Sequence, residues 1–341
     1  MKTIVLVLMV LVSLVLPPPV HGQDMGELFR KVSPAVVVIR AKGREVSAGS
    51  SGLVYFNEIG SGVLISSDGK VMTASHVVHA MDEIMVEFLG GQTVAAHVVA
   101  SEPAADLSLL QLETVPSGAQ VAPLGDSTRV RVGDQVVIVG APYGLSHSLS
   151  VGWISARYPP NTVYRSIPLA EFLQTTATIN QGNSGGPMFN TAGEVIGIVS
   201  HNISKSGGSE GLGFVVSSNS ARQLLLERKS FWSGIEGMLV SGELAEILNV
   251  PQPAGYLVKA VAKDSPAWLL GVQGGDRIAK IGGEEVVVRG DIILAIAGIQ
   301  VGSPDSFFTV RERMQAMRPG DEITIKVLRA GQILDLRGRL P

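Results

Sequence analysis

The sequence predicts a mainly β protein in which a larger all-β half precedes a smaller α+β domain. Three observations support this fold class. The chain has 341 residues, a length typical of about two domains. It contains 40 glycines with no collagen-like period, which indicates many turns between short strands. Hydrophobic residues make up 45% and charged residues 17%, a composition that excludes an intrinsically disordered chain.

Charge and cysteine content exclude several function classes. Lys and Arg total 27 against 30 Asp and Glu, so the net charge is −3 and no basic surplus exists to bind nucleic acid. Cysteine is absent, which excludes disulfides, thiol nucleophiles and thiolate metal sites. We therefore expect no nucleic-acid partner, no metal and no cofactor.

The first 22 residues have the pattern of a secretory signal peptide. Lys2 precedes the segment from Ile4 to Leu16, which is apolar except for Ser13, and three prolines follow it. These 13 residues are short of the roughly 20 that a membrane-spanning helix needs. We expect a cleaved signal over residues 1–22, with an uncleaved anchor as the alternative. In either case the protein works outside the cytoplasm.

The all-β half is predicted from closely spaced apolar segments bounded by Gly, Pro, Asp or Ser. A short helix is expected over 24–32, and a glycine- and serine-rich loop over 43–62. Strands are expected over 35–39, 63–65, 70–73, 84–88, 93–100, 107–112, 135–139, 148–155, 194–200 and 213–216. This spacing predicts a sandwich or barrel of two subdomains. The one helix expected inside this half covers 218–228.

The second domain begins near Gly237 and mixes strands with two helices. Strands are expected over 255–261, 292–297, 322–328 and 333–337, and helices over 241–248 and 304–317. Residues 275–282 are echoed by 290–298. We interpret the first copy as an extra hairpin, near 275–289, inserted into an ordinary small domain.

Three segments carry the residues needed for nucleophilic acyl transfer. His76 is followed by Asp106 after 30 residues and by Ser184 after a further 78. A serine hydroxyl must lose its proton to a base as it attacks, histidine can accept that proton near neutral pH, and a buried carboxylate orients the histidine. The backbone amides of Gly182, Asn183 and Ser184 could together stabilise the oxyanion.

Each of these residues also has an ordinary structural interpretation. His76 alone could be a buried core histidine, while Asp106 and Ser184 alone are typical turn residues. Their order and local sequence together predict a catalytic triad. His79 follows His76 by three residues, a spacing found in metal sites, but no acidic or cysteine partner clusters near it.

Longer motifs extend the pattern beyond the triad. They are residues 60–69, 124–127, 131–134, 140–144 and 174–187, together with the His76 and Asp106 segments. Over residues 24–341 the sequence resembles the HtrA/Deg family, trypsin-like serine proteases that carry carboxy-terminal PDZ domains. The resemblance implies a trypsin-like double β-barrel over 35–230 and a single PDZ domain over 237–341.

Assembly and location also follow from the resemblance. It implies a homotrimer in which an amino-terminal segment, here residues 23–34, packs between subunits. It also implies a periplasmic protein, tethered to the inner membrane if the leader is not cleaved.

The resemblance further implies two binding sites. Ile179, Val199, Ser200 and His201 would form the primary substrate pocket, which would select a small or medium apolar residue. In the PDZ domain, Gly255, Tyr256, Leu257 and Val258 would form the carboxylate-binding loop for carboxy-terminal peptides, with the strand 257–261 pairing with the peptide. The helix 304–317 would then supply apolar pocket walls.

These expectations combine into one function and one alternative. The sequence predicts an exported serine endopeptidase that degrades or processes misfolded or signalling proteins and is regulated by peptides bound to its PDZ domain. The alternative is a chaperone or scaffold that uses the PDZ groove and has weak or dormant protease activity. An esterase is excluded because the His-Asp-Ser chain order is wrong for the α/β-hydrolase fold.

Overall fold

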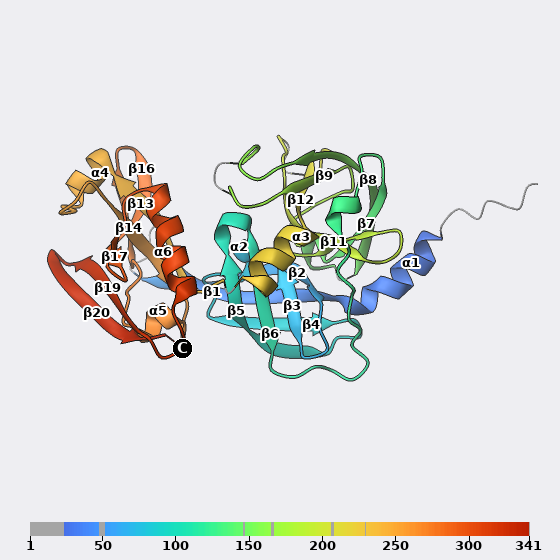
Figure 1. Ribbon diagram of the computed structural model, residues 1–341, viewed down its shortest axis with the longest axis horizontal. Helices are drawn as coiled ribbons and strands as arrows, with labels where there is room; N and C mark the ends of the chain where they lie inside the picture. The colour runs from blue at the N-terminus through green and yellow to red at the C-terminus, as the bar shows by residue number, and fades with distance from the viewer. Residues whose placement is uncertain are drawn as a thin grey trace, which may run out of the picture.

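The computed structural model describes residues 24–47, 52–145, 147–164, 167–205, 208–228 and 230–340. The predicted signal peptide lies outside these residues. Two domains are visible: a double barrel, and a smaller carboxy-terminal domain at the end opposite to helix α1 (Met25–Val32) (Figure 1). In the part of the chain described, no helix has the length and apolar character to cross a membrane.

The first domain consists of two closed antiparallel barrels. The first barrel has the strand order β1-β2-β3-β6-β5-β4 and the second β10-β11-β12-β9-β8-β7. Their strands are β1 (Val36–Val46), β2 (Leu53–Leu64), β3 (Lys70–Thr73), β4 (Glu83–Phe88), β5 (Thr93–Glu102), β6 (Leu107–Leu112), β7 (Gln135–Gly140), β8 (Ser148–Tyr158), β9 (Phe172–Thr175), β10 (Pro187–Asn190), β11 (Val195–Asn202) and β12 (Gly213–Ser217). Of the two predicted arrangements, the barrel is therefore confirmed.

Short helical segments connect and flank these strands. They are η1 (Ser33–Ala35), α2 (Ser75–Val78), η2 (Pro103–Ala105), η3 (Ser127–Arg129), η4 (Pro142–Gly144), α3 (Ser218–Ala221) and η5 (Arg222–Glu227). The expected helix 218–228 is thus split, because α3 continues as the π-helical segment η5. The predicted amino-terminal helix is confirmed as α1, where the Asp24 side chain caps the first turn.

The carboxy-terminal domain has a sheet with the order β13-β14-β17-β19-β20, and β18 pairs with β17. Its elements are β13 (Ile235–Ser241), α4 (Gly242–Ile247), β14 (Ala254–Val261), α5 (Pro266–Leu269), β15 (Arg277–Ile281), β16 (Glu284–Val288), β17 (Ile292–Ile296), β18 (Ile299–Gln300), α6 (Pro304–Ala316), β19 (Glu322–Arg329) and β20 (Gln332–Arg339). The expected hairpin near 275–289 is present, since β15 and β16 form a separate two-stranded sheet.

One predicted loop is wrong. Instead of a loop over 43–62, of which 48–51 lie outside the described residues, β1 and β2 pair continuously from Val46↔Leu53 to Val36↔Val63 and extend beyond the barrel. Glycine and serine suggested a loop, but the neighbouring Val54-Tyr55-Phe56 favours a strand. Four of the described strands were not expected at all: β9, β10, β13 and β18.

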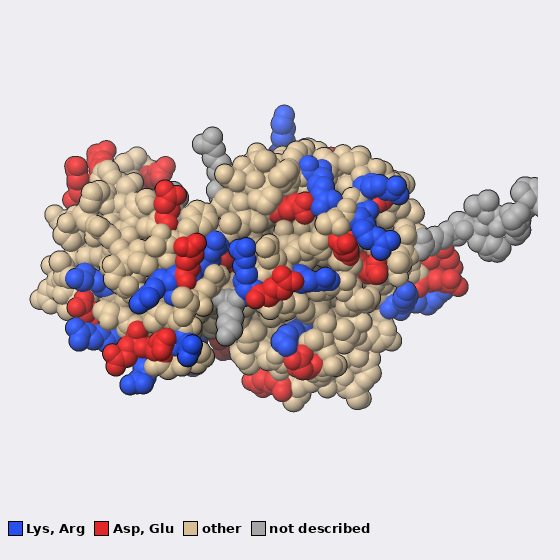
Figure 2. Space-filling model, in the orientation of Figure 1, with Lys and Arg blue, Asp and Glu red and all other residues tan. Residues whose placement is uncertain are grey.

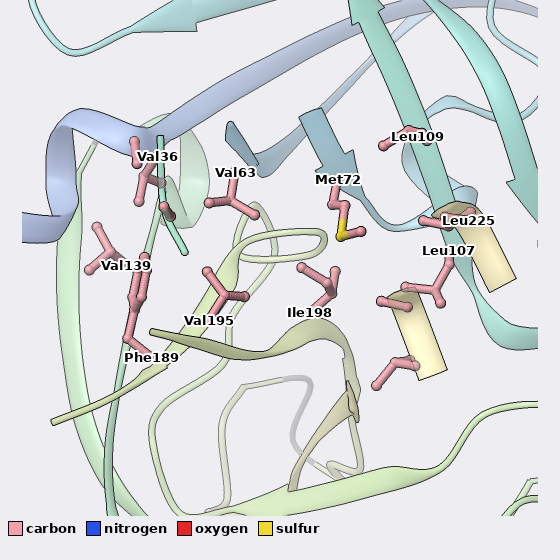
Figure 3. Packing of buried hydrophobic residues seen from close by; sticks show 14 of the residues in the cluster. Val36, Val63, Met72, Leu107, Leu109, Val139, Phe189, Val195, Ile198 and Leu225 are labelled. Atoms are coloured by element: carbon pink, nitrogen blue, oxygen red, sulfur yellow. The ribbon is translucent and has the colours of Figure 1, made fainter. Parts of the chain in front are cut away.

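A shared hydrophobic core fixes the two barrels relative to each other. Phe189 of the second barrel is fully buried near Val139, together with Val36, Val63 and Met72 of the first barrel (Figure 3). Leu28 and Val32 of α1 also belong to this cluster. Because side chains from both barrels interdigitate here, residues at the seam between the barrels have defined positions.

Candidate active site

His76 lies on the short helix α2, which directly follows β3 of the first barrel. Its neighbours Val77 and Val78 are fully buried and anchor the helix to the barrel core. The His76 side chain keeps 47% of its surface exposed. The local sequence therefore holds the backbone of α2 in the core while the imidazole faces the seam.

Asp106 lies directly before β6, the strand that pairs with β3. Its φ of 54° places it in the left-handed region at the end of η2, and only 6% of the residue is exposed. The carboxylate accepts hydrogen bonds from His76 Nδ1 at 2.9 Å, from the His76 amide at 3.2 Å and from the Ser75 hydroxyl at 3.2 Å. This set of donors holds the imidazole with Nε2 free to act as a base.

The His76–Asp106 pair shifts both pKa values. Burial alone would raise the pKa of Asp106, but the hydrogen bonds and charge of His76 and the Ser200 hydroxyl outweigh it and lower the pKa. Burial alone would lower the pKa of His76, but the hydrogen bond and charge of Asp106, with Glu58 further away, raise it. Asp106 therefore remains a carboxylate and His76 is made more basic.

Ser184 lies in the turn between β9 and β10, and both barrels hold this turn. The Ser61 amide of β2 donates to the Ser184 carbonyl at 2.8 Å, and the Gly185 amide donates to the Val199 carbonyl of β11 at 2.7 Å. Gly185 has a φ of +81°, and a Cβ there would clash with Thr73 and Ser61. Only glycine fits this close approach between the barrels.

Ser200 connects the nucleophile candidate to the acid. The Ser184 hydroxyl donates to the Ser200 carbonyl at 3.4 Å, and the Ser200 hydroxyl donates to Asp106 at 2.5 Å. Within the described residues, no hydrogen bond joins Ser184 to His76. The structure therefore brings the three predicted residues to one seam, with the serine hydroxyl turned toward Ser200.

Two of the three predicted oxyanion amides are available. The Gln181 carbonyl accepts from the Tyr143 amide at 2.8 Å, which turns the Gly182 amide the opposite way. Among the described residues, neither the Gly182 nor the Ser184 amide has a hydrogen-bond partner. The prediction for Asn183 is wrong, because its amide donates to the Asn180 carbonyl within the turn.

The predicted substrate pocket stays a prediction, because its four residues lie in different surroundings. Ile179 and Val199 are 2% and 0% exposed in the core of the second barrel, so as side chains they do not line an open pocket. Ser200 directs its hydroxyl to Asp106, a contact that the sequence reasoning missed. The sequence marked it only as the last residue of the predicted strand 194–200. His201 is half-buried and packs against an aromatic cluster.

The predicted carboxylate-binding loop in the second domain is wrong. Tyr256 pairs with Leu239 of β13 on one side and with Ile293 of β17 on the other, so β14 has no free edge for a peptide. The edge strands of this sheet are β13 and β20 instead. A cavity of 630 Å³ lies beside the start of β13 and is lined by Ile235, Glu236, Gly237, Tyr256, Phe307, Phe308, Val310, Arg311, Met314 and residues of the first domain.

Polar contacts join the two domains beside this cavity. Arg311 of α6 forms an ion pair with Glu102 at 3.1 Å, and Trp232 Nε1 donates to the His79 carbonyl at 2.8 Å. His79 Nε2 donates to the Ile235 carbonyl, and its Nδ1 accepts from Ser101. Both ring nitrogens are thus engaged, so His79 is a structural residue. Charges of both signs meet at this junction (Figure 2).

The double barrel with a His-Asp pair and a serine at its seam defines the class of trypsin-like serine peptidases. A model of the trypsin-like peptidase domain matches residues 60–198. DegP-like periplasmic serine endoproteases from Ectopseudomonas mendocina (strain ymp) and Pseudomonas putida (strain GB-1) are 36% and 38% identical over 79% and 74% of this chain. These alignments cover 56% and 53% of those proteins, so the chain spans about half their length.

Solved structures extend the comparison to the second domain. The HtrA-type protease AlgW, with a decapeptide and with a tripeptide, gives TM-scores of 0.53 in both cases, at 28% and 30% identity. The alignments cover 93% of this chain and 98% and 97% of those chains. The chain belongs to the HtrA/Deg family of serine proteases, as its motifs indicated.

Proposed function

We propose that this chain is a serine endopeptidase with Ser184 as nucleophile, His76 as general base and Asp106 as the orienting acid. The observation that carries this proposal is the His76–Asp106 hydrogen bond of 2.9 Å, with a buried carboxylate, at the same seam as Ser184. This arrangement activates a serine in acyl transfer.

The proposed reaction begins with a rotation of the Ser184 side chain. Its hydroxyl leaves the Ser200 carbonyl and donates to His76 Nε2, which takes the proton as the oxygen attacks the peptide carbonyl. The amides of Gly182 and Ser184 stabilise the oxyanion, and His76 returns the proton to the leaving amine. Water then hydrolyses the acyl-enzyme by the same route.

A fluorophosphonate reagent tests the nucleophile directly. We expect stoichiometric labelling of Ser184, located by mass spectrometry, and loss of both labelling and casein hydrolysis in Ser184→Ala. Ser204→Ala, which changes a serine outside the site, is the matched control and should label normally. A folded wild-type protein that neither labels nor hydrolyses casein, with or without peptide, would contradict the proposal.

The carboxy-terminal domain is proposed to be a PDZ domain that binds carboxy-terminal peptides at β13. The edge position of β13 supports this role, because a peptide can add there as a further strand. The apolar cavity beside it suits an apolar last side chain, and related AlgW structures contain peptides. We expect Phe308→Glu to weaken binding of a fluorescein-labelled peptide with an apolar terminus, and Leu269→Glu, on an exposed surface, to leave it unchanged.

Unfolded or signalling proteins are the proposed substrates, with protein quality control as the setting. The rival function, a chaperone with dormant protease activity, is favoured by one observation: the Ser184 hydroxyl is turned toward Ser200. Ser184→Ala separates the two functions. A protease loses its effect on unfolded casein, whereas a chaperone still prevents aggregation at the same protein concentration.

Assembly and location complete the proposal. Export to the periplasm is supported by residues 1–22 and by the periplasmic relatives. A homotrimer is proposed because Met25 and Phe29 of α1 remain half-buried beside the core and could be covered by a neighbouring copy. Analytical ultracentrifugation should show a trimer that Phe29→Glu dissociates. A monomeric wild type would contradict this assembly.

A further inference from the structure

His201 lies next to Ser200 and reaches the same hydroxyl that contacts the catalytic acid. Its Nδ1 is 2.9 Å from Ser200 Oγ, which is itself 2.5 Å from Asp106. Consecutive residues of a regular strand point to opposite faces. Here the register of β11 shifts between Val199 and His201, and such a bulge redirects side chains. The bulge explains how the His201 side chain reaches the hydroxyl of its neighbour Ser200.

The donors and acceptors in this chain can be assigned. Asp106 is a carboxylate and can only accept hydrogen bonds, so the single proton of the Ser200 hydroxyl goes to Asp106. Ser200 Oγ must then accept from His201, which requires a proton on His201 Nδ1. A chain of donors therefore runs from His201 through Ser200 to Asp106.

The surroundings hold the His201 ring in this orientation. Phe214 stacks on it at 5.4 Å with an interplanar angle of 13°, while Tyr164 and Phe172 contact it edge-on at 4.2 and 5.5 Å. Within the described residues, His201 Nε2 is buried without a hydrogen-bond partner. Burial lowers the pKa of His201. The negative charge of Asp106 opposes this shift, and the charge of His76 adds to it. A lowered pKa favours the neutral ring, and the contact with Ser200 Oγ places its single proton on Nδ1.

We propose that His201 is a positioning residue of the active site, which fixes the Ser200 hydroxyl as a donor to Asp106 and thereby orients His76. This inference rests on the proposed catalytic role of the triad. It differs from the pocket role expected from sequence, because the effect of His201 passes through Ser200 and not through substrate contact.

Steady-state kinetics with a fluorogenic peptide that has valine before the scissile bond test this role. We expect His201→Phe, which keeps an aromatic ring, to lower kcat about five- to tenfold with KM within twofold. His201→Asn, whose amide can replace Nδ1–H, should restore kcat to within threefold of wild type, whereas His201→Gln should not. His97→Phe, on an exposed strand position, is the control and should match wild type.

A double-mutant cycle separates positioning from a structural role. In a Ser200→Ala background, His201→Phe should have no further effect on kcat. An unchanged kcat in His201→Phe alone, an equal loss in His201→Asn, or an undiminished effect in the Ser200→Ala background would overturn the inference. If His201→Phe fails to fold, the Asn and Gln variants decide between the same outcomes.

Nitrogen-15 NMR of the protein with labelled histidines tests the tautomer of His201 directly and does not depend on enzyme activity. The Nδ1–H tautomer of His201 is expected in the wild-type protein, and assignment by comparison with His201→Asn identifies its signals. The Nε2–H tautomer would overturn the proposal even if the enzyme is active. An inactive protein with the Nδ1–H tautomer would count against the proposed peptidase function and leave the hydrogen-bond chain intact.

Discussion

The ion pair between Glu102 and Arg311 gives a quantitative prediction about the domain junction. It joins the end of β5, four residues before Asp106, to the helix that lines the cavity of the second domain. The side chain of Glu102 is 9% exposed and that of Arg311 is 23% exposed. The perturbation is Arg311→Met, which keeps most of the apolar stem and removes only the charge and its donors.

The expected loss follows from the geometry. At 3.1 Å and an effective dielectric constant of about 20, two unit charges attract by about 5 kcal/mol, which largely offsets the cost of burying them. Arg311→Met leaves Glu102 buried without a partner, so we expect the free energy of unfolding to fall by about 3 kcal/mol. Glu102→Gln leaves an arginine that can turn to water and should cost about 1 kcal/mol. The double variant should lose about 2 kcal/mol of unfolding free energy. This is about 2 kcal/mol less than the sum of the two single losses, and that difference is the coupling energy of the pair.

The loss should also depend on pH. Burial raises the pKa of Glu102, and Arg311 opposes this shift, so removing Arg311 raises the pKa further. A carboxyl whose pKa is higher in the folded state stabilises the fold while protonated, and that stability is lost as pH rises through the folded pKa. Arg311→Met should therefore be less destabilising at pH 5, where Glu102 can take a proton, than at pH 8.

Trp232 supplies the assay, because its indole donates to the His79 carbonyl across the junction. Its fluorescence during urea titration can be isolated by replacing the exposed Trp153 and Trp268 with Phe. Lys42→Met, which removes the longer and more exposed ion pair to Glu83, is the control and should change stability by less than about 0.5 kcal/mol. The reasoning is refuted if Arg311→Met matches this control, or if its cost is greater at pH 5.

Three further perturbations test the site and its support. Asp106→Asn should lower kcat/KM by about 10⁴-fold and move the acid limb of the pH–rate profile to lower pH, since the carboxylate raises the pKa of His76. Phe189→Ala should reduce the free energy of unfolding by about 3–5 kcal/mol, because the ring is fully buried between the barrels. Gly182→Ala should lower kcat by about 10²–10³, as its φ is +97° and a Cβ would clash with a backbone carbonyl; Gly208→Ala, in open space, should be neutral.

Local sequence predicted the elements whose ends are set by neighbouring residues in the chain. The strand 70–73 was expected with the bounds it has, because a short apolar run stands between turn residues. The triad could be expected for a different reason: its three residue types occur in a recognisable order and context. The structure places His76 and Asp106 in contact because β3 pairs with β6, with Thr73 opposite Ser108.

Elements that depend on distant partners could not be predicted in this way. Val54, Tyr55 and Phe56 form a strand because β1 pairs with them beyond the barrel, although glycine and serine surround them. The family resemblance implied a peptide-pairing strand at 257–261, in a segment with a strong apolar pattern. That pattern reflects a strand buried between two others, whereas the edge strand β13 is more exposed and has a weaker signal.

The same limit applies to Ser200 and His201, for which the family resemblance implied a pocket role. A strand pattern assigns alternate residues to opposite faces. No sequence feature marked the bulge that brings the His201 ring to the Ser200 hydroxyl. In this fold the bulge converts two strand neighbours into successive members of a hydrogen-bond chain ending at Asp106. Because the Ser200 carbonyl also accepts from Ser184, the same short segment of β11 contacts both the Asp106 carboxylate and the Ser184 hydroxyl.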